Sequence, residues 1–281
     1  MPELPEVETI KRGLQTAIKG KKIADINVLN TNSFKGNSKK AIGSSVLEVK
    51  RRAKMLIIKL PEDLLLIHLK MSGQLIFQPK NEKPEKLKNK QKVLKLPNKH
   101  TRVILKFTDG SKLFFNDIRK FGWIKILSPK DFMLQTKSLG PEPLKKEFTS
   151  DYLKQIFTRS QRPIKLMLMD QTKIAGIGNI YASEALFMAG INPEKKVNTL
   201  KSKEIKALKK AVVKVLKKGI KYKGSSAQDK TYIQPTGEIG SYQHHFLVYQ
   251  RNNKKCKICA RIIKRIKIGG RSTFYCNNCQ T

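Results

Sequence analysis

The feature that most constrains this chain is the placement of its four cysteines, all of which lie in the last 26 residues. They form two CxxC pairs, Cys256 with Cys259 and Cys276 with Cys279, separated by sixteen residues. Each CxxC turn directs two thiolates toward one point, and two such turns make a tetrahedral site for Zn²⁺. This spacing is typical of a zinc ribbon. Four cysteines that were merely buried in a core would not be expected to occur as two CxxC pairs. An iron–sulfur cluster is the weaker alternative in a hairpin so short and basic.

The surroundings of the cysteines indicate what the metal is for. Nine basic and no acidic residues lie between positions 251 and 281. Four cysteine ligands fill the coordination sphere of zinc and leave no open position for chemistry. We therefore expect one structural zinc ion that folds a small cationic module able to touch phosphates.

The whole chain is strongly basic. Its 281 residues include 59 Lys and Arg against 21 Asp and Glu, a formal charge of +38. Such an excess predicts a polyanionic partner, with nucleic acid first and an anionic membrane surface second. No apolar run reaches membrane-spanning length, and the acidic, proline-bearing start is not a signal peptide. We therefore expect a cytoplasmic protein, in which part of the lysine excess is compositional.

The N-terminal half of the chain has the pattern of a helix followed by many short strands. Apolar residues recur at helical spacing over 5–19, with acids in the first turn and Gly20 as a stop. Strand-like runs follow at 23–29, 45–51, 55–60, 64–69, 73–77, 102–108, 112–116 and 123–127. Close spacing and turn signals favour an antiparallel sandwich or barrel, with a lysine-rich surface loop at 79–99.

The sequence "SLGPEP" at 138–143 indicates a domain boundary, after which the pattern becomes helical. Helices are predicted at 149–158, 163–170, 179–189 and 199–222. The last combines an apolar stripe with lysines, ten of which lie between 201 and 223. We interpret it as a helix that packs on a neighbour and turns a solvated face outward. A Gly/Ser/Gln-rich segment, 223–243, precedes the cysteines.

The stretch "AGIGNIYASEALF" places Gly176, Gly178 and Asn179 before a helix. Asn179 is a good N-cap, and glycines let a backbone approach a ligand closely. Helix N-termini favour anions, so a DNA phosphate fits here. An ordinary turn is the alternative, and the charge of the chain favours the phosphate.

The chain opens "MPELPEVETI". A small second residue permits removal of Met1, which would leave Pro2 as a terminal secondary amine. An α-amino group titrates near 8, so far more of it is free base at neutral pH than of a lysine. Such an amine can attack a sugar C1′ and form an iminium, with Glu3 moving protons at the same centre. A plain helix start is the alternative, and from chemistry alone it is slightly favoured.

These stretches together resemble the bacterial formamidopyrimidine-DNA glycosylases. The resemblance lies in "PELPEVET", "RRAKMLIIKL", "IHLKMSGQL", "NDIRKFG", "LGPEPL", "IKLMLMDQTKIAGIGNIYASEALFMAGINP" and "GGRSTFYCNNCQ", in the family's order. It implies an α+β multidomain fold: an N-terminal helix with an antiparallel β-sandwich, a helix–two-turn–helix domain and a C-terminal zinc-ribbon hairpin. On this basis we predict a catalytic domain at 1–137, a DNA-binding domain with the lesion loop at 138–240 and a zinc finger at 241–281.

The resemblance also implies roles for single residues. Pro2 resembles the nucleophile that forms a Schiff base with C1′, and Glu3 resembles the proton donor. Lys54 resembles the residue implicated in β-elimination, and Arg271 the phosphate-gripping arginine implicated in δ-elimination. Residues expected to enter the duplex or contact DNA are Met71, Arg119, Phe121, His100, Arg162, Lys165 and Asn179. Without the family, Met71 and Phe121 would be interpreted as core residues.

The implied activity is that of a bifunctional DNA glycosylase and abasic-site lyase. Its expected substrate is duplex DNA that carries 8-oxoguanine, formamidopyrimidines or abasic sites, and we expect a monomer with no membrane partner, associated with the bacterial nucleoid. The related endonuclease VIII class, which removes oxidised pyrimidines, typically begins "PEGPE", and Leu4 argues against it. A non-catalytic zinc-ribbon nucleic-acid binder is the third alternative, and Pro2, Glu3 and Lys54 argue against that one.

The chain also departs from the family pattern. Ala53, Lys70 and Ala260 stand where the pattern has glycine, and Ile118 and Lys120 replace a proline and an arginine. None of these changes removes a catalytic group. Lys70 directly precedes Met71, and glycine tolerates backbone angles that lysine does not.

Overall fold

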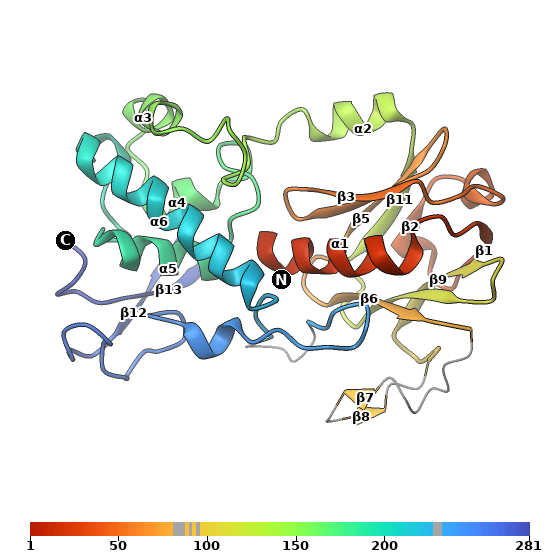
Figure 1. The fold of residues 1–281 in the computed structure, drawn as a ribbon. Coiled ribbons are helices and arrows are strands. Elements are labelled where there is room, and N and C mark those ends of the chain that lie inside the picture. The colour runs from red at the N-terminus through yellow and green to blue at the C-terminus, as the bar shows by residue number, and fades with distance from the viewer. Residues whose placement is uncertain (81–87, 90–91, 94–95, 227–231) are drawn as a thin grey trace. The chain divides into compact units, whose positions relative to one another are not determined.

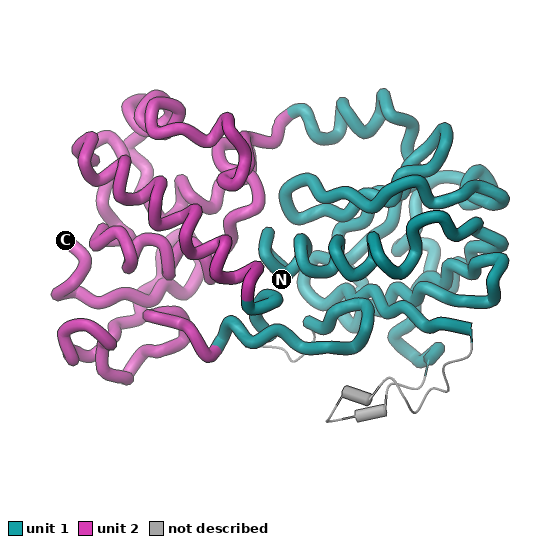
Figure 2. The backbone as a smooth tube through the Cα atoms, in the orientation of Figure 1, with its two compact units in different colours: residues 1–137, 222–243 teal, residues 138–221, 244–281 magenta. Residues whose placement is uncertain are grey.

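The computed structural model describes residues 1–80, 88–89, 92–93, 96–226 and 232–281. The chain forms two compact units: one comprises 1–137 and 222–243, and the other 138–221 and 244–281 (Figure 2). Both units are therefore discontinuous in sequence. The division into domains at 1–137, 138–240 and 241–281 stays a prediction.

The first unit opens with α1 (Leu4–Ile18), close to the predicted helix (Figure 1). Its apolar residues fall at helical spacing, and Val7, Ile10, Leu14 and Ile18 are at most 1% exposed. Burying a side chain of this size stabilises a fold by about 1.5–3 kcal/mol. Hydrophobic burial thus fixes α1 firmly against the sheets.

Two sheets follow α1 in the same unit. The four-stranded sheet has the order β1 (Ile23–Val28), β9 (Thr101–Phe107), β10 (Lys112–Asp117), β6 (Gly73–Gln78). The five-stranded sheet has the order β2 (Phe34–Lys35), β11 (Trp123–Leu127), β5 (Leu64–His68), β4 (Met55–Lys59), β3 (Glu48–Arg52). Neighbouring strands are antiparallel except β2 and β11. A short hairpin, β7 (Lys88–Asn89) with β8 (Lys92–Val93), stands apart from both sheets.

The core of this unit lies between the sheets and α1. Alternate residues of each strand enter it, as the strand period of two requires: Leu65 and Ile67 from β5, and Val103 and Leu105 from β9. The predicted helix-led antiparallel sandwich is thus confirmed.

Two elements were absent from the sequence expectations, and one expectation is largely untested. Helix α2 (Pro129–Thr136) was not predicted, because none of its residues is buried and no apolar face marks it. Strand β2 is too short to give a pattern. The predicted 79–99 surface loop lies in large part outside the described residues.

The second unit contains the helices and the cysteine hairpin. Its helices are α3 (Ser150–Thr158), α4 (Ile164–Met169), α5 (Asn179–Ala189) and α6 (Ser202–Lys221). Helix α5 is buried on all sides, from Tyr181 to Phe187, and contacts α4, α6 and the hairpin of β12 (Lys264–Ile268) and β13 (Arg271–Tyr275) (Figure 1). The described chain also has short 3₁₀ helices: η1 (Thr31–Ser33), η2 (Ser38–Ala41), η4 (Val197–Thr199) and η5 (Tyr242–His245).

Seven non-glycine residues of the described chain have a backbone in the left-handed region, and three of them matter here. Ala53, Lys70 and Ala260 have φ values of 52°, 49° and 60°. These are the three positions at which the resembling family pattern has glycine. The chain therefore keeps turns suited to glycine while placing a Cβ in each, which is unfavourable.

Among the described residues, no helix combines the length and the apolar character that crossing a membrane requires.

Candidate functional site

The start of α1 is a buried polar cluster. Pro2 is buried, and Glu3, the N-cap of α1, is 3% exposed. The Glu3 amide donates to a carboxylate oxygen of Glu6 at 2.9 Å, which with the reciprocal bond forms a capping box. The backbone directly after Pro2 is therefore held in place.

Glu6 also ties the helix to a segment far away in sequence. Its other carboxylate oxygen accepts from the Ser225 amide at 2.8 Å. Gly224, with φ 77°, makes this approach possible, because a Cβ there would lie 2.8 Å from Cγ of Glu6. The Tyr232 hydroxyl donates to the carbonyl oxygens of Lys223 at 3.0 Å and Glu6 at 3.3 Å. Ser225 and Tyr232 are thus bonded to α1, while 227–231 between them lie outside the described residues.

Lys54 sits in the two-residue turn between β3 and β4 and is 6% exposed. The turn is tied to α1 through Arg51, whose guanidinium donates to Glu8 at 3.0 Å and to the Ala53 carbonyl at 2.9 Å. Burial would raise the pKa of Glu8, but its bonds to Arg51 and Arg12 hold that pKa below its usual range. Through its bonds to Glu8 and to the Ala53 carbonyl, Arg51 therefore links the turn of Lys54 to the helix that begins directly after Pro2 and Glu3.

His68 ends the strand that leads to Met71. Its Nδ1 accepts from the Lys70 amide at 3.0 Å, so the imidazole shapes the turn before the half-buried Met71. Burial, then the charges of Lys70 and Lys54, lowers the pKa of His68 to about 3. The imidazole is thus neutral at physiological pH and can accept this bond.

Asp117, at the end of β10, organises the turn that carries Arg119 and Phe121. Its carboxylate, fully buried, accepts from the Ser72 hydroxyl at 2.5 Å, the Arg119 amide at 3.2 Å and the Gly122 amide at 2.6 Å. The 71–73 turn and the β10–β11 turn therefore share one buried anion. Gly122 is needed here, because a Cβ would lie 2.8 Å from the Phe115 ring.

The tip of this turn is exposed. Phe121 is 55% exposed, and the Arg119 guanidinium lies 5.0 Å from its ring centroid. Lys120 between them has a φ of 58°. This placement excludes the core interpretation for Phe121 and suits a residue that enters a duplex. His100, half-buried, precedes β9 and closes this region through its carbonyl, which accepts from the Asp117 amide at 2.9 Å.

In the second unit, the predicted DNA-contacting residues surround the start of α5. Lys165 is fully buried, and its ammonium donates to the Asn179 carbonyl at 2.9 Å and to the Ser183 hydroxyl at 2.5 Å. Arg162 is half exposed and pairs with Asp170 at 2.7 Å. Lys165 therefore braces the helix, whereas Arg162 has an acid that competes with any phosphate.

The expected N-cap role of Asn179 is wrong. Gly178 is the N-cap, and Asn179 is the first helical residue. The Asn179 side chain instead donates to the carbonyl of Ser272 at 2.9 Å, next to Arg271. No side-chain hydrogen bond caps the helix at Gly178.

Arg271 is exposed directly after the turn of the β12–β13 hairpin. Gly269 and Gly270 form that turn with φ values of 54° and 77°, which two-residue hairpins favour. Gly269 packs so closely that a Cβ would lie 2.5 Å from the Leu166 side chain. The hairpin tip is thus pressed against α4 and bonded to the start of α5, which brings Arg271 and Asn179 together.

The four cysteines form one cluster whose sulfur atoms all lie within 4.8 Å of one another. Sγ of Cys256 lies 3.9 Å from that of Cys279, and Sγ of Cys259 lies 3.4 Å from that of Cys276. A tetrahedral zinc with bonds of about 2.3 Å has sulfurs roughly 3.8 Å apart. The cluster therefore fits a tetrahedral thiolate site.

Glu184 connects α5 to the chain that enters this zinc finger. Its carboxylate accepts from the amides of Leu247, Val248 and Tyr249 at 2.8, 2.9 and 2.8 Å. Burial raises the pKa of Glu184 against the effect of these three donors. The carboxylate is thus a buried anchor for the segment that leads to Cys256.

Sequence reasoning missed three buried acids whose hydrogen bonds hold the segments that carry the candidate site residues. They are Glu6, Asp117 and Glu184. Glu6 was interpreted as a first-turn acid, and its partner Ser225 is 219 positions away. An acid inside an otherwise apolar stretch, as in "YASEALF", is the signal that could have pointed to Glu184.

Three family models match the chain. Residues 1–124 match the formamidopyrimidine-DNA glycosylase N-terminal domain, and residues 139–231 the formamidopyrimidine-DNA glycosylase H2TH domain. Residues 253–281 match a zinc finger found in FPG and IleRS.

Full-length relatives agree. The formamidopyrimidine-DNA glycosylase of Bacillus licheniformis is 37% identical over 100% of this chain and 99% of its own length. That of Pelotomaculum thermopropionicum is 39% identical with the same coverage.

Solved structures show the same fold. A Lactococcus lactis FPG variant in complex with Fapy-dG-containing DNA superimposes with a TM-score of 0.88, 32% identity and 99% coverage of both chains. MutM (FPG) from Thermus thermophilus gives 0.87 and 34%, covering 99% of this chain and 98% of its own.

Proposed function

The chain belongs to the formamidopyrimidine-DNA glycosylase family, and from that premise we propose that it excises oxidised purines from duplex DNA and then cuts the strand as an abasic-site lyase. The observation that carries the proposal is the start of α1. There Pro2 and Glu3 are buried together and fixed by Glu6.

The reaction begins with the Pro2 nitrogen. As a free terminal amine it bonds to C1′ while the bond from C1′ to the damaged base breaks, and Glu3 supplies a proton at the same centre. The Pro2 nitrogen loses its proton to the departing base, and the C1′–O4′ bond breaks as O4′ takes the proton from Glu3, which leaves an iminium between Pro2 and C1′. This iminium draws electrons from C2′, whose proton becomes acidic. Its removal breaks the C3′–O3′ bond by β-elimination, and a second elimination breaks C5′–O5′.

Lys54 and Arg271 serve these eliminations. Lys54 lies in a turn tied to α1, so its amine can move protons during β-elimination. Arg271 is exposed at the hairpin tip, where it can grip a phosphate and aid its departure in δ-elimination. Asn179, whose side chain bonds to Ser272 beside Arg271, would contact a further phosphate.

Met71, Arg119 and Phe121 extract the nucleotide. An enzyme that works at C1′ must take the nucleotide out of the stack. Met71 and Phe121 fill the gap, and Arg119 donates to the orphaned base. Their two turns share Asp117, so they act as one unit.

A borohydride trapping experiment tests this function. The protein is incubated with a duplex that carries 8-oxoguanine opposite cytosine, reduced and analysed by mass. We expect an adduct at Pro2, and its absence from a chain shown by mass to lack Met1 would refute the mechanism. Faster release of thymine glycol than of 8-oxoguanine would instead assign the endonuclease VIII class.

We further propose that Cys256, Cys259, Cys276 and Cys279 hold one structural Zn²⁺. The ion would cross-link the hairpin and keep Arg271 in place; the thiolates would be its only protein ligands. Metal analysis should find one equivalent, and much less than one in folded protein would contradict the site. The chain would work in the cytoplasm of a bacterium and as a monomer. Sedimentation with and without a duplex tests the monomeric state.

A further inference from the structure

Helix α6 carries a second basic surface that the proposed function does not use. Six exposed lysines lie between positions 203 and 221 of α6. Their mean spacing is 3.6 residues, which equals one turn of an α-helix. They form a single line on one face of the helix. We name this line the lysine stripe: Lys203, Lys206, Lys210, Lys214, Lys217 and Lys221.

The opposite face of α6 is apolar and packed. Ile205, Leu208, Val212 and Val215 are at most 4% exposed, and α6 contacts α5 and α3. Rotation by 100° per residue places these side chains about half a turn from the stripe. The stripe therefore faces away from α5, whose first residue Asn179 lies beside the Arg271 hairpin.

The central lysines of the stripe, Lys206 to Lys217, have no acidic partner among the described residues. Glu204 is the only acid in α6, and it is engaged by Lys195 and by the Lys201 amide, each at 2.8 Å. Among the described residues, none forms an ion pair or hydrogen bond with the side chains of Lys206, Lys210, Lys214 or Lys217.

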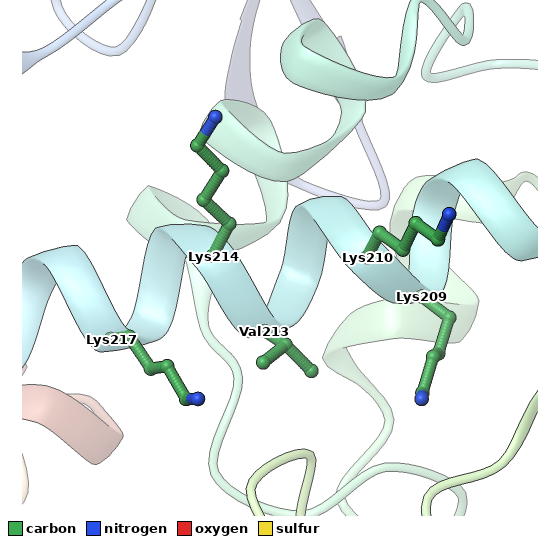
Figure 3. A pocket seen from close by; sticks show the side chains of 5 residues that line it. All are labelled: Lys209, Lys210, Val213, Lys214 and Lys217. Carbon is green, nitrogen blue, oxygen red and sulfur yellow. The ribbon is translucent and has the colours of Figure 1, made fainter.

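Figure 3 shows how these lysines surround a hollow on the helix. Lys209 and Lys217 point to the same side as Val213, and Lys210 and Lys214 point away from it. These five residues line a hollow of about 360 Å³, all from α6. The ammonium groups of Lys209 and Lys217 thus lie on the same side of α6 as the Val213 side chain, and those of Lys210 and Lys214 lie on the other side (Figure 3).

A helix face that is only solvent-exposed does not require an uninterrupted line of like charges. Like charges three and four residues apart destabilise a helix, and solvated helices commonly alternate the two signs. Within the described residues, the four lysines from Lys206 to Lys217 keep this uniform charge without an ion pair or hydrogen bond. A polyanion that binds along the stripe would remove the repulsion.

We propose that the lysine stripe binds the phosphate backbone of a second duplex segment while the catalytic site holds the lesion strand. The stripe is about 27 Å long at 1.5 Å per residue. It matches roughly eight base pairs of duplex at 3.4 Å each. The inference takes DNA as the partner from the proposed function, and adds a site on the far side of α6 that lets the enzyme bridge two segments.

The test compares two variants with the same reduction in charge. One carries Lys206→Gln, Lys210→Gln, Lys214→Gln and Lys217→Gln, since glutamine keeps the helix propensity. The control carries Lys39→Gln, Lys40→Gln, Lys112→Gln and Lys130→Gln, all exposed in the first unit. Each protein is saturated with a short 8-oxoguanine duplex, and binding of a differently labelled undamaged duplex is then measured from 50 to 200 mM salt.

We expect the wild type and the control to capture the second duplex, and the stripe variant to bind it at least tenfold more weakly. The logarithmic salt slope of that second step should fall by about 3 to 4, or roughly 0.9 for each phosphate that a lysine no longer neutralises. Excision of 8-oxoguanine from the short duplex should be equal in all three proteins.

Several outcomes overturn the proposal. They are a single duplex bound by the wild type at every salt, equal weakening in both variants, or binding of phosphatidylserine vesicles in place of the second duplex. Failure of the proposed function gives a different result, because excision would then be absent while second-duplex binding can still be measured on undamaged DNA.

Discussion

The start of α1 and the β10–β11 turn lie in the same unit, yet they present their side chains in opposite ways. Glu3 is 3% exposed and Phe121 is 55% exposed. Pro2 and Glu3, assigned to bond chemistry, are buried, whereas Arg119 and Phe121, assigned to the duplex, stand at the surface. A reacting atom must be positioned before substrate arrives, but a wedge gains its contacts only from the DNA.

The largest effect is expected from blocking the Pro2 nitrogen. A chain that keeps a residue ahead of Pro2 has no free secondary amine there, so covalent catalysis is lost. Single-turnover excision should fall about 10³-fold or more, with no trapped adduct. Thermal unfolding should be unchanged, because Met1 is itself 37% exposed. A trapped adduct with the blocked chain would show that another amine reacts.

The next largest effect is expected from removal of the Glu6 carboxylate, which should lower the free energy of unfolding. Glu6→Ala leaves the buried amides of Glu3 and Ser225 without their acceptor, at about 1–3 kcal/mol each. Urea denaturation measures the destabilisation. The control is Glu48→Ala, which breaks an exposed pair with Lys50 that is worth about 1 kcal/mol or less. Equal destabilisation by both substitutions would mean that the start of α1 is not anchored by Glu6.

His68 should give the chain a pH dependence. Its folded pKa of about 3 lies below the 6.5 of the unfolded chain, so only the unfolded chain binds the proton between these values. The stabilisation is complete above pH 6.5 and is lost as the pH falls toward 3. Between pH 7 and 5 the free energy of unfolding should drop by up to about 2 kcal/mol. His68→Gln should flatten this slope, and an unchanged slope would exclude His68 as its source.

The smallest effect should come from Phe121→Ala. Its exposure predicts a stability change within about 0.5 kcal/mol. Capture of an 8-oxoguanine duplex should weaken about tenfold, and binding to an abasic duplex less, since no base must be extruded there. Ile118→Ala is the control, because Ile118 is 52% exposed near the same turn. Equal weakening on both duplexes, or with Ile118→Ala, would remove the wedge role.

Local patterns made most of the fold predictable. The strands over 55–59 and 64–68 were predicted because "PED" marks the turn between two apolar runs. Helix α2 escaped because its apolar residues Met133 and Leu134 are 67% and 63% exposed and make no buried face.

The candidate site was predictable only in part. Family motifs identified Pro2, Lys54 and Arg271, but the bonds that place them join distant residues. The contact between Glu6 and Ser225 leaves no local trace in the sequence. The side chain of Asn179 bonds to Ser272 instead of capping its own helix, which no propensity scale could indicate.

The left-handed turns at Ala53, Lys70 and Ala260 bear on how much heat the enzyme tolerates. A Cβ in this conformation costs about 1–2 kcal/mol, of which glycine would recover part after its own entropy loss. For a chain of this size, each kcal/mol corresponds to roughly 2–4 °C in melting temperature. The three turns are thus a reserve of thermostability, which substitution to glycine would release without altering a proposed catalytic side chain.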